Sequence, residues 1–206
     1  MEKHSTIKAK SVHETAVLEH PVHVTAGVVL GRAVSLGKYT YISEGTRVNS
    51  GTQIGRFCSI ATDCELGAQD HPLDWLSTHP FQYSPNQFKS CQEYVGVKHI
   101  KWSAGPITIV GNDVWIGSKS IVCRGVKVGD GAVIGAGSFV NKDVPNYAVV
   151  AGTPARIIRY RFTPEIISEL IDLKWWEKDI SEIGNLNFSS IKDCIDKLKL
   201  TKEESK

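Results

Sequence analysis

The chain is dominated by a six-residue spacing of aliphatic residues, which runs in two unbroken registers. The earlier register contains Leu30, Leu36, Ile42, Val48, Ile54, Ile60 and Leu66. The later one contains Val110, Ile116, Val122, Val128, Ile134 and Val140, and in four of its six steps Gly follows directly. An α-helix repeats every ~3.6 residues and a strand every ~2, so neither has this period. The spacing therefore predicts a repeat architecture.

Six residues are enough for one short strand and one corner, and three such units return the chain above its starting point. Each coil would then hydrogen-bond to the coil beneath it, at a spacing of about 4.8 Å. Leu30, Val48 and Leu66 should form one inward-facing column. The Gly that follows an on-register aliphatic should lie at a corner, where a Cβ would obstruct the next coil. Because one coil cannot bury its own apolar face, the coils must stack.

This reading predicts an all-β protein, a parallel β-helix of triangular section with about five coils. An ordinary β-sandwich with accidental spacing is the alternative. Coiling should begin near Ala16, because Leu18 and Val24 share the register of Leu30. The polar residues 1 to about 15 should form a loose arm or one edge strand.

The two registers are separated by a long aperiodic segment, whose stretch AQDHPLDWLSTHPFQYSPNQF (68–88) contains two His residues, aromatic residues and three Pro. A long loop inside a compact repeat is usually functional or disordered. Its aromatic and proline content favours an ordered functional loop over disorder. We expect this insertion, about residues 67–106, to project away from the β-helix.

A helical segment is predicted after the second register. Thr163 is a suitable N-cap, Pro164 fits the first helical position, and Glu165 favours the helix dipole. The first helix should run to about Trp176, and a second should span roughly residues 190–200. We therefore divide the chain into a β-helical domain, residues 1–162, and a C-terminal helical segment with a solvated tail, residues 163–206.

Composition excludes several classes of function. The formal net charge is +2, from 24 basic and 22 acidic residues, so nothing favours nucleic acid as a partner. The chain has no apolar run of 18 residues and no apolar signal core at its N-terminus, so we expect no membrane insertion. Five Cys without paired spacing fit a reducing compartment. We expect a soluble cytoplasmic protein.

Three segments resemble the hexapeptide-repeat acyltransferases: VGNDVWIG (110–117), GVKVGDGAVIGAGSFVNKDVP (125–145) and AGTPARIIRYRF (151–162). The segment TPEIISELIDLKWW (163–176) resembles the tail of their xenobiotic-acetyltransferase branch, which includes virginiamycin and hexapeptide-type chloramphenicol acetyltransferases. The resemblance implies that the β-helix is left-handed, a hand that the period alone does not give. It also implies a homotrimer that uses acetyl-CoA as acyl donor, without a metal.

Two His residues in the insertion are candidates for a general base. Acyl transfer from a thioester needs a base to take the proton of the attacking hydroxyl or amine, and His titrates near neutral pH. In galactoside acetyltransferases a GHP segment at the matching place carries this base, and here the segment reads Asp70-His71-Pro72. We therefore assign His71 as the catalytic residue, with Asp70 and Pro72 as candidates for orienting its ring. His79 is the second candidate, and we expect it to line the acceptor pocket.

The predicted donor site follows one edge of the coils. Ser118 and Ala136 lie 18 positions apart, one full coil, and should stack on the same edge. Small residues there would let an extended pantetheine lie along the edge, and the resemblance implies this role for both. Trp115 should lie close to the thioester, although a purely structural role is the alternative.

The resemblance also implies a set of phosphate-binding residues. The Thr-Lys pair of the family reads Asn141-Lys142 here, so the cation is kept while the hydroxyl is lost. Lys142, Arg156 and Arg159 would meet the CoA phosphates, for which fixed positive charge is suited. The alternative for each is an ordinary solvated surface cation.

The favoured function is transfer of an acetyl group to a hydroxyl of a sugar or polysaccharide precursor, without a covalent intermediate. Alternatives in the same class are an antibiotic O-acetyltransferase, of the streptogramin or chloramphenicol type, and an N-acetyltransferase of a nucleotide-linked amino sugar. A zinc-dependent carbonic anhydrase on the same repeat would need three convergent His, and both coil registers contain none. A non-catalytic β-helix scaffold is the remaining alternative.

Overall fold

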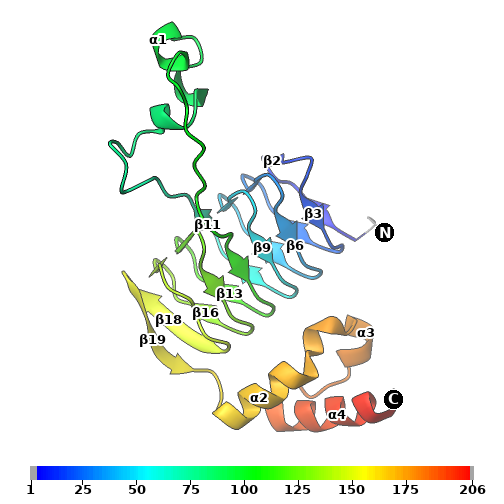
Figure 1. Ribbon diagram of the computed structural model, residues 1–206. Helices are drawn as coiled ribbons and strands as arrows, with labels where there is room; N and C mark the ends of the chain where they lie inside the picture. Colours follow the sequence, from blue (N-terminus) through cyan, green and yellow to red (C-terminus); the bar gives the residue numbers. More distant parts are fainter. Residues whose placement is uncertain (1–3, 205–206) are drawn as a thin grey trace.

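The computed structural model describes residues 4–204, with side chains as far as Thr201. They form a β-helix of three sheets, with an arm on one side and helices on another (Figure 1). Sheet A contains β1 (Thr6–Ile7), β4 (His23–Val24), β7 (Tyr41–Ile42), β10 (Ser59–Ile60), β13 (Trp115–Ile116), β16 (Val133–Ile134), β18 (Ala148–Gly152) and β19 (Ala155–Tyr160). Sheet B contains β2 (Ser11–Val12), β5 (Val29–Leu30), β8 (Arg47–Val48), β11 (Glu65–Ala68), β14 (Ile121–Cys123) and β17 (Phe139–Val140). Sheet C contains β3 (Val17–Leu18), β6 (Ser35–Leu36), β9 (Gln53–Ile54), β12 (Ile109–Val110) and β15 (Lys127–Val128).

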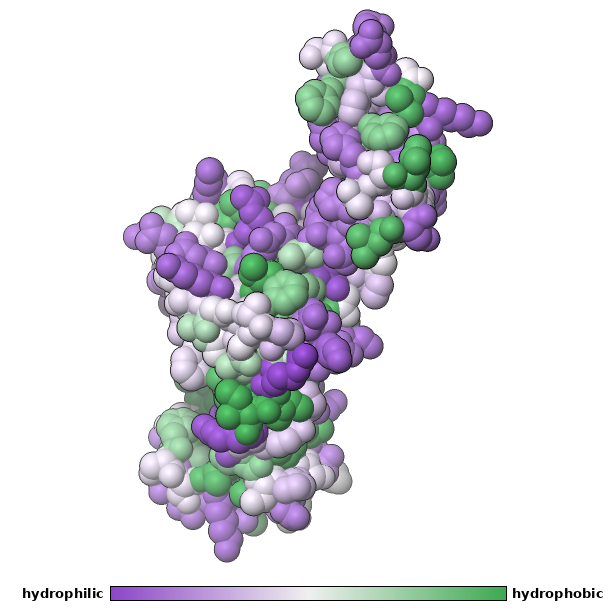
Figure 2. Space-filling view, turned by 90° about the vertical axis from the view of Figure 1, so that its left-hand side faces the viewer, coloured by the Kyte–Doolittle hydropathy of each residue, from purple (hydrophilic) through white to green (hydrophobic). Residues whose placement is uncertain are grey.

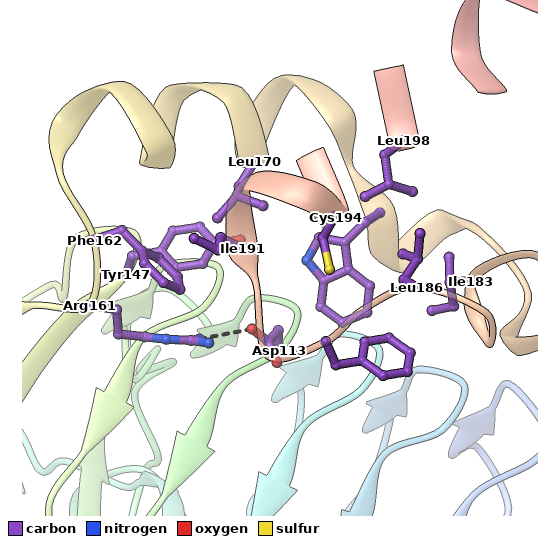
Figure 3. A pocket seen from close by; sticks show the side chains of 12 residues that line it. Asp113, Tyr147, Arg161, Phe162, Leu170, Ile183, Leu186, Ile191, Cys194 and Leu198 are labelled. Carbon is purple, nitrogen blue, oxygen red and sulfur yellow. Dashed lines mark hydrogen bonds and ion pairs between the residues drawn. The ribbon is translucent and has the colours of Figure 1, made fainter. Parts of the chain in front are cut away.

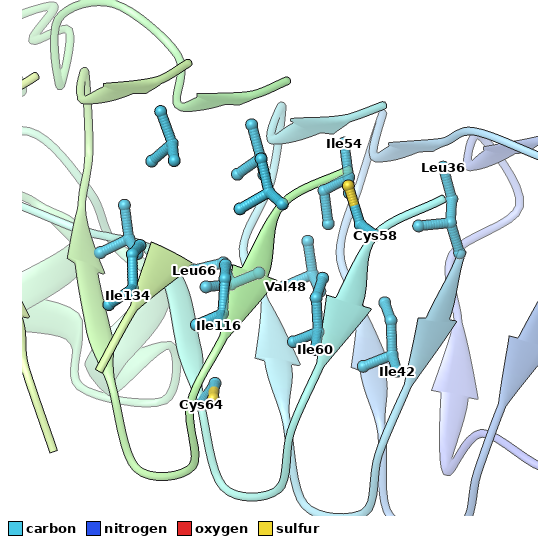
Figure 4. Packing of buried hydrophobic residues seen from close by; sticks show 14 of the residues in the cluster. Leu36, Ile42, Val48, Ile54, Cys58, Ile60, Cys64, Leu66, Ile116 and Ile134 are labelled. Atoms are coloured by element: carbon cyan, nitrogen blue, oxygen red, sulfur yellow. The ribbon is translucent and has the colours of Figure 1, made fainter. Parts of the chain in front are cut away.

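The observed register confirms the predicted left-handed parallel β-helix. Leu30 pairs with Val48, and Val48 with Leu66, so the predicted column is present. A Cβ placed on Gly37 would lie 2.5 Å from the carbonyl carbon of Gly55 in the next coil, so only Gly fits that corner. Figure 4 shows the inward aliphatic side chains stacked from coil to coil.

The N-terminal prediction was wrong. Strands β1 and β2 already belong to the first coil, since Thr6 pairs with His23 and Val12 pairs with Leu30. Val12 shares the six-residue register, but Ile7 is one residue out of step with it. The six-residue spacing therefore did not indicate this coil. The six strands of sheet B show that the β-helix has at least six coils, more than the predicted five or so.

The chain passes from sheet A to sheet B to sheet C in each coil, which creates three kinds of corner. We name them the A–B, B–C and C–A corners after the sheets they join. Hydroxyl groups close several of them from inside, as where the buried Thr46 side chain donates to the Ala61 carbonyl at 2.8 Å. These hydrogen bonds fix the backbone at the corners.

The insertion leaves and rejoins the β-helix at the B–C corner, and we call it the arm (residues 69–108). It projects away from the prism, as predicted, and contains only η1 (Pro80–Gln82), η2 (Asn86–Phe88) and α1 (Gln92–Val95) (Figure 1). The register resumes across it, because Ile54 pairs with Val110. Figure 2 shows apolar side chains on the surface of the arm, where Leu73 and Leu76 are 88% and 94% exposed.

The C-terminal segment contains α2 (Pro164–Leu173), η3 (Trp175–Glu177), α3 (Ile180–Ile183) and α4 (Ile191–Glu204). Thr163 occupies the N-cap position of α2 as predicted, although its side chain makes no capping hydrogen bond. The helix ends earlier than expected because Lys174 takes a left-handed conformation with φ of 44°. The second predicted helix is longer than expected, and α3 was not predicted. The segment docks on the C–A corner, where the Phe57 and Trp175 rings lie 5.0 Å apart and Lys38 pairs with Asp179. Among the described residues, no helix has the length and apolar character needed to cross a bilayer.

Candidate active site

His71 lies at the start of the arm, three residues beyond the last residue of β11. Its Nδ1 is 2.8 Å from the carbonyl oxygen of Thr78 and 3.0 Å from the hydroxyl oxygen of Tyr83. Asp70 and Pro72, the predicted orienting residues, do not supply these contacts. The ring is therefore held by the arm folding back on itself.

These contacts select one tautomer of His71. A carbonyl oxygen can only accept a hydrogen bond, so Nδ1 must carry the proton. Nε2 of the neutral ring is then an unprotonated acceptor, which is the state that a general base needs. The exposed position of the side chain leaves Nε2 open to an incoming acceptor.

Tyr83, which contacts this imidazole, belongs to a cluster of aromatic side chains. The Tyr83 ring lies 4.8 Å from Trp102 and 6.2 Å from Trp75 between ring centroids. Burial raises the pKa of Tyr83, which keeps its hydroxyl protonated at neutral pH. The rings form a partly buried wall beside His71 that could contact a ring-shaped acceptor.

His79 lies farther along the arm, at the N-terminus of η1. Its Nδ1 accepts a hydrogen bond from the backbone N–H of Phe81 at 3.3 Å. The proton of a neutral His79 ring must then be on Nε2, which cannot take a proton from an acceptor. Its ring lies 6.4 Å from Phe88 and 6.0 Å from Tyr94, in an aromatic cluster separate from the one around His71.

Arg124 anchors the base of the arm, a role that the sequence did not indicate. Its guanidinium donates to the carbonyl oxygens of Ala104 and Ser50, both at 3.2 Å. Its backbone N–H donates to the carbonyl of Ala68 at 3.0 Å. Thr78 and Tyr83 were also missed, because a contact made through a folded loop leaves no spacing pattern.

Ser118 and Ala136 lie together at the A–B corner, as predicted. The Gly137 backbone N–H donates to the Ser118 carbonyl at 2.8 Å, which stacks the two corners. A Cβ on Gly117 would lie 2.5 Å from the backbone nitrogen of Ala136. In the coil below, the Thr62 hydroxyl bonds the Ser118 hydroxyl at 3.2 Å. The corner is thus a strip of small residues along the coil edges.

Arg156 and Arg159 lie on β19, the antiparallel strand that closes sheet A. Arg156 is opposite Ala151 and Arg159 is opposite Val149, and a bulge between these pairs puts both arginines on the outer face. Neither guanidinium pairs with a carboxylate among the described residues. A groove on the same face is lined by Arg159 and by Trp115, which is 56% exposed.

Asn141 and Lys142 lie elsewhere. They follow β17 at the B–C corner and are both exposed. In a triangular prism this corner is opposite sheet A, so the structure does not bring Lys142 together with Arg156 and Arg159.

The candidate residues therefore form two groups at opposite edges of sheet B. We name the A–B corner with Ser118 and Ala136, and the adjoining outer face of sheet A, the donor half. The arm with His71, and Lys142 at the B–C corner, make the base half. A single protomer separates the two halves by the width of a face.

The cysteines give no support for a covalent route. Cys58 and Cys64 are buried in the core, and burial raises the pKa of the Cys58 thiol to about 12. The Cys58 thiol donates to the Gly111 carbonyl at 3.1 Å, which fits a role in packing. Among the side chains that the structure describes, as far as Thr201, no three His, Cys, Asp or Glu are grouped so as to hold a metal ion.

The profile of the bacterial transferase hexapeptide, six repeats, matches residues 107–142. A chloramphenicol acetyltransferase from Agrobacterium fabrum is 44% identical over 123 residues, covering 58% of this chain and 56% of the relative. A probable macrolide acetyltransferase from Lysinibacillus sphaericus is 38% identical over 130 residues, covering 62% of this chain and 70% of the relative. The chain spans 56% to 60% of the length of the chloramphenicol acetyltransferases that it matches.

The solved structure of a mutant N-acyltransferase from Bacillus cereus superimposes with a TM-score of 0.54 at 21% identity. The superposition covers 82% of this chain and 91% of that one. At this identity the likeness supports the fold alone.

Proposed function

The chain belongs to the bacterial hexapeptide-repeat acetyltransferases, and from that premise we propose that it transfers an acetyl group from acetyl-CoA to a hydroxyl of a small acceptor. His71 is the general base. The observation that carries this proposal is the contact of Nδ1 with the Thr78 carbonyl, because it leaves Nε2 free to accept a proton.

The proposed step conserves atoms and charge. Nε2 of His71 takes the acceptor's hydroxyl proton as its oxygen attacks the thioester carbonyl carbon. The tetrahedral intermediate collapses, the new ester C–O bond remains and the C–S bond breaks. The imidazolium then returns its proton to the departing CoA sulfur, so no acetyl-enzyme forms.

A sugar hydroxyl, which the sequence analysis favoured, is the first acceptor class. An antibiotic hydroxyl is the second, and the relatives favour it, since those quoted above are a chloramphenicol and a probable macrolide acetyltransferase. The rings of Trp75, Tyr83 and Trp102 suit either class, because an aromatic face packs on a sugar ring and on an aromatic ring alike.

A panel assay that follows CoA release separates the two classes. Chloramphenicol, a macrolide, a streptogramin, a galactoside and an amino sugar nucleotide serve as acceptors, with acetyl-CoA as donor. We expect kcat/KM for one hydroxyl-bearing class to exceed that for the others at least tenfold. Acetylation of the amino sugar nucleotide alone would contradict O-acetyl transfer. If none of the acceptors causes CoA release, the non-catalytic scaffold is favoured instead.

The donor half would hold acetyl-CoA. Pantetheine lies along the small residues Ser118 and Ala136, with the thioester near Trp115. Arg156 and Arg159 contact the phosphates of one donor, and Lys142 reaches that donor from a neighbouring copy, with Asn141 beside it.

Replacing Arg159 by Ala should weaken acetyl-CoA binding roughly 10- to 100-fold, as expected for loss of one charge-assisted hydrogen bond. Replacing Arg156 or Lys142 by Ala should weaken acetyl-CoA binding by a similar factor. Calorimetric titration with acetyl-CoA gives the affinities, and an acetyl-pantetheine thioester is the control. Equal losses of affinity for the truncated donor would show that these cations do not contact the phosphates.

The separation of the two halves favours a cyclic homotrimer with sites between copies. If sheet B faces the threefold axis, the A–B corner of each copy lies beside the B–C corner of the next. Val29, Ile121 and Phe139 project outward from sheet B and would be covered at the axis. Each donor half then meets the His71 of a neighbour.

Mixed trimers test this arrangement. His71→Ala removes the base, and Ala136→Trp fills the donor strip, so each variant alone should be inactive. Random co-assembly leaves about a quarter of the interfaces with an intact base and an intact strip, and should restore roughly that share of activity. Sedimentation must show each variant as a trimer. No recovery in mixed trimers, or a stable monomer with full activity, would contradict a shared site.

A further inference from the structure

The C-terminal segment encloses a cavity of about 190 Å³ against the C–A corner (Figure 3). Its walls are mainly apolar: Phe162 and Leu170 lie at one end, and Ile183, Leu186 and Leu198 at the other. The volume exceeds the ~150 Å³ of an apolar cavity that admits benzene. Phe188 lines the cavity and is 69% exposed, so it marks an opening to solvent.

One polar group in the wall has no hydrogen-bond acceptor. Tyr147 is 1% exposed, and its hydroxyl has no acceptor within hydrogen-bond distance among the described residues. Burial raises the pKa of Tyr147 to about 12, and the indole N–H of Trp175 opposes that rise, but an indole N–H can only donate to the hydroxyl oxygen. The hydroxyl proton therefore has no acceptor, although leaving a buried donor unpaired is unfavourable.

The rest of the corner holds this hydroxyl in place. The Tyr147 ring packs on Gly131, where an added Cβ would lie 2.3 Å from the ring. The Arg161 guanidinium lies 5.2 Å from the ring centroid and donates to the Gly131 carbonyl at 2.8 Å. Tyr147 is thus fixed by its neighbours rather than free to turn its hydroxyl toward water.

The other polar feature of the cavity is a closed ion pair. Arg161 donates to the Asp113 carboxylate at 2.8 Å. Burial raises the pKa of Asp113, and Arg161 opposes that rise. Because the charge is neutralised within the wall, the cavity offers no net charge to attract an ion.

We propose that this cavity is a binding site for a neutral, ring-sized apolar molecule with one carbonyl or ether oxygen, which accepts the proton of the Tyr147 hydroxyl. The apolar walls take the ring, and the oxygen accepts the proton of the Tyr147 hydroxyl. A carboxylate is disfavoured because Arg161 is already paired with Asp113, so this ion pair offers it no free cation. The site is on the C–A corner, away from the base half, and Asp113 and Arg161 separate it from the groove of the donor half, which they also line.

Acetophenone and cumene test the proposal, because they share size and shape but only acetophenone carries an acceptor oxygen. Titrations of the full-length protein, followed by the indole N–H resonance of Trp175, give both affinities. We expect acetophenone to bind roughly three- to tenfold more tightly than cumene, the increment of one net hydrogen bond. Tyr147→Phe should remove that preference and leave cumene binding unchanged.

Tyr39→Phe is the matched control, since Tyr39 lies on the same corner but its hydroxyl is directed to Asp179 at 3.4 Å. It should keep the acetophenone preference. Ile191→Phe should fill the cavity and weaken binding of both probes. The proposal is overturned if neither probe binds, the result expected if the Tyr147 hydroxyl pairs only with water. It is also overturned if the preference for acetophenone over cumene survives in Tyr147→Phe. These readouts do not involve acetyl transfer, so they stand apart from the proposed function.

Discussion

Replacing His71 by Ala should lower turnover about 10²- to 10⁴-fold, the range typical of a positioned general base. Without the imidazole, nothing takes the acceptor proton as the thioester is attacked. Acetyl-CoA affinity should barely change, because the ring meets the acceptor and approaches the donor only near its thioester. Steady-state kinetics and calorimetric titration of acetyl-CoA measure the two quantities.

His79→Ala is the matched control, because it removes the other imidazole of the arm. Its Nδ1 accepts from the Phe81 backbone N–H, so we expect a smaller loss of activity, mainly through a higher KM for the acceptor. Near-normal turnover in His71→Ala combined with an inactive His79→Ala would reverse the assignment. Acetylated protein trapped without acceptor would instead indicate a covalent intermediate.

Gly37→Ala should destabilise the fold by about 3 kcal/mol, the upper range for overpacking. The added Cβ would lie 2.5 Å from the carbonyl carbon and 2.6 Å from the carbonyl oxygen of Gly55. These are backbone atoms of the next coil, so relief requires the two coils to separate. For a chain of this length the change lowers Tm by roughly 6 to 12 °C, measured by circular dichroism or calorimetry.

Gly105→Ala provides the comparison, since a Cβ there meets no atom within 4 Å. Gly105 has a φ of +78°, so only the left-handed backbone penalty of about 1 kcal/mol applies. Similar losses for the two variants would show that coil spacing is not what requires Gly37.

The repeat was predictable because its signal is local and recurs. Each aliphatic of the register is paired with one in the next coil, as Leu30 is with Val48, so a pattern in sequence becomes a column in space. The first coil was missed because Ile7 is out of step. The antiparallel β19 was missed because it ends the repeat rather than continuing it.

The candidate site was predictable only where it shares that periodicity. Ser118 and Ala136 are one coil apart, and the structure stacks them. The partners of His71 were not predictable, because Thr78 and Tyr83 reach it through a fold-back of the arm. No motif encodes such a contact. The residue roles themselves remain predictions until the variants are measured.

The unbroken register across the arm has an evolutionary consequence. Ile54 meets Val110, and Leu66 meets Val122, as directly as neighbouring coils do elsewhere in the β-helix. Lengthening, shortening or exchanging the segment between Ala68 and Ile109 leaves those pairings in place. A lineage can therefore graft new loops onto this corner and acquire new acceptors while its scaffold stays under separate selection.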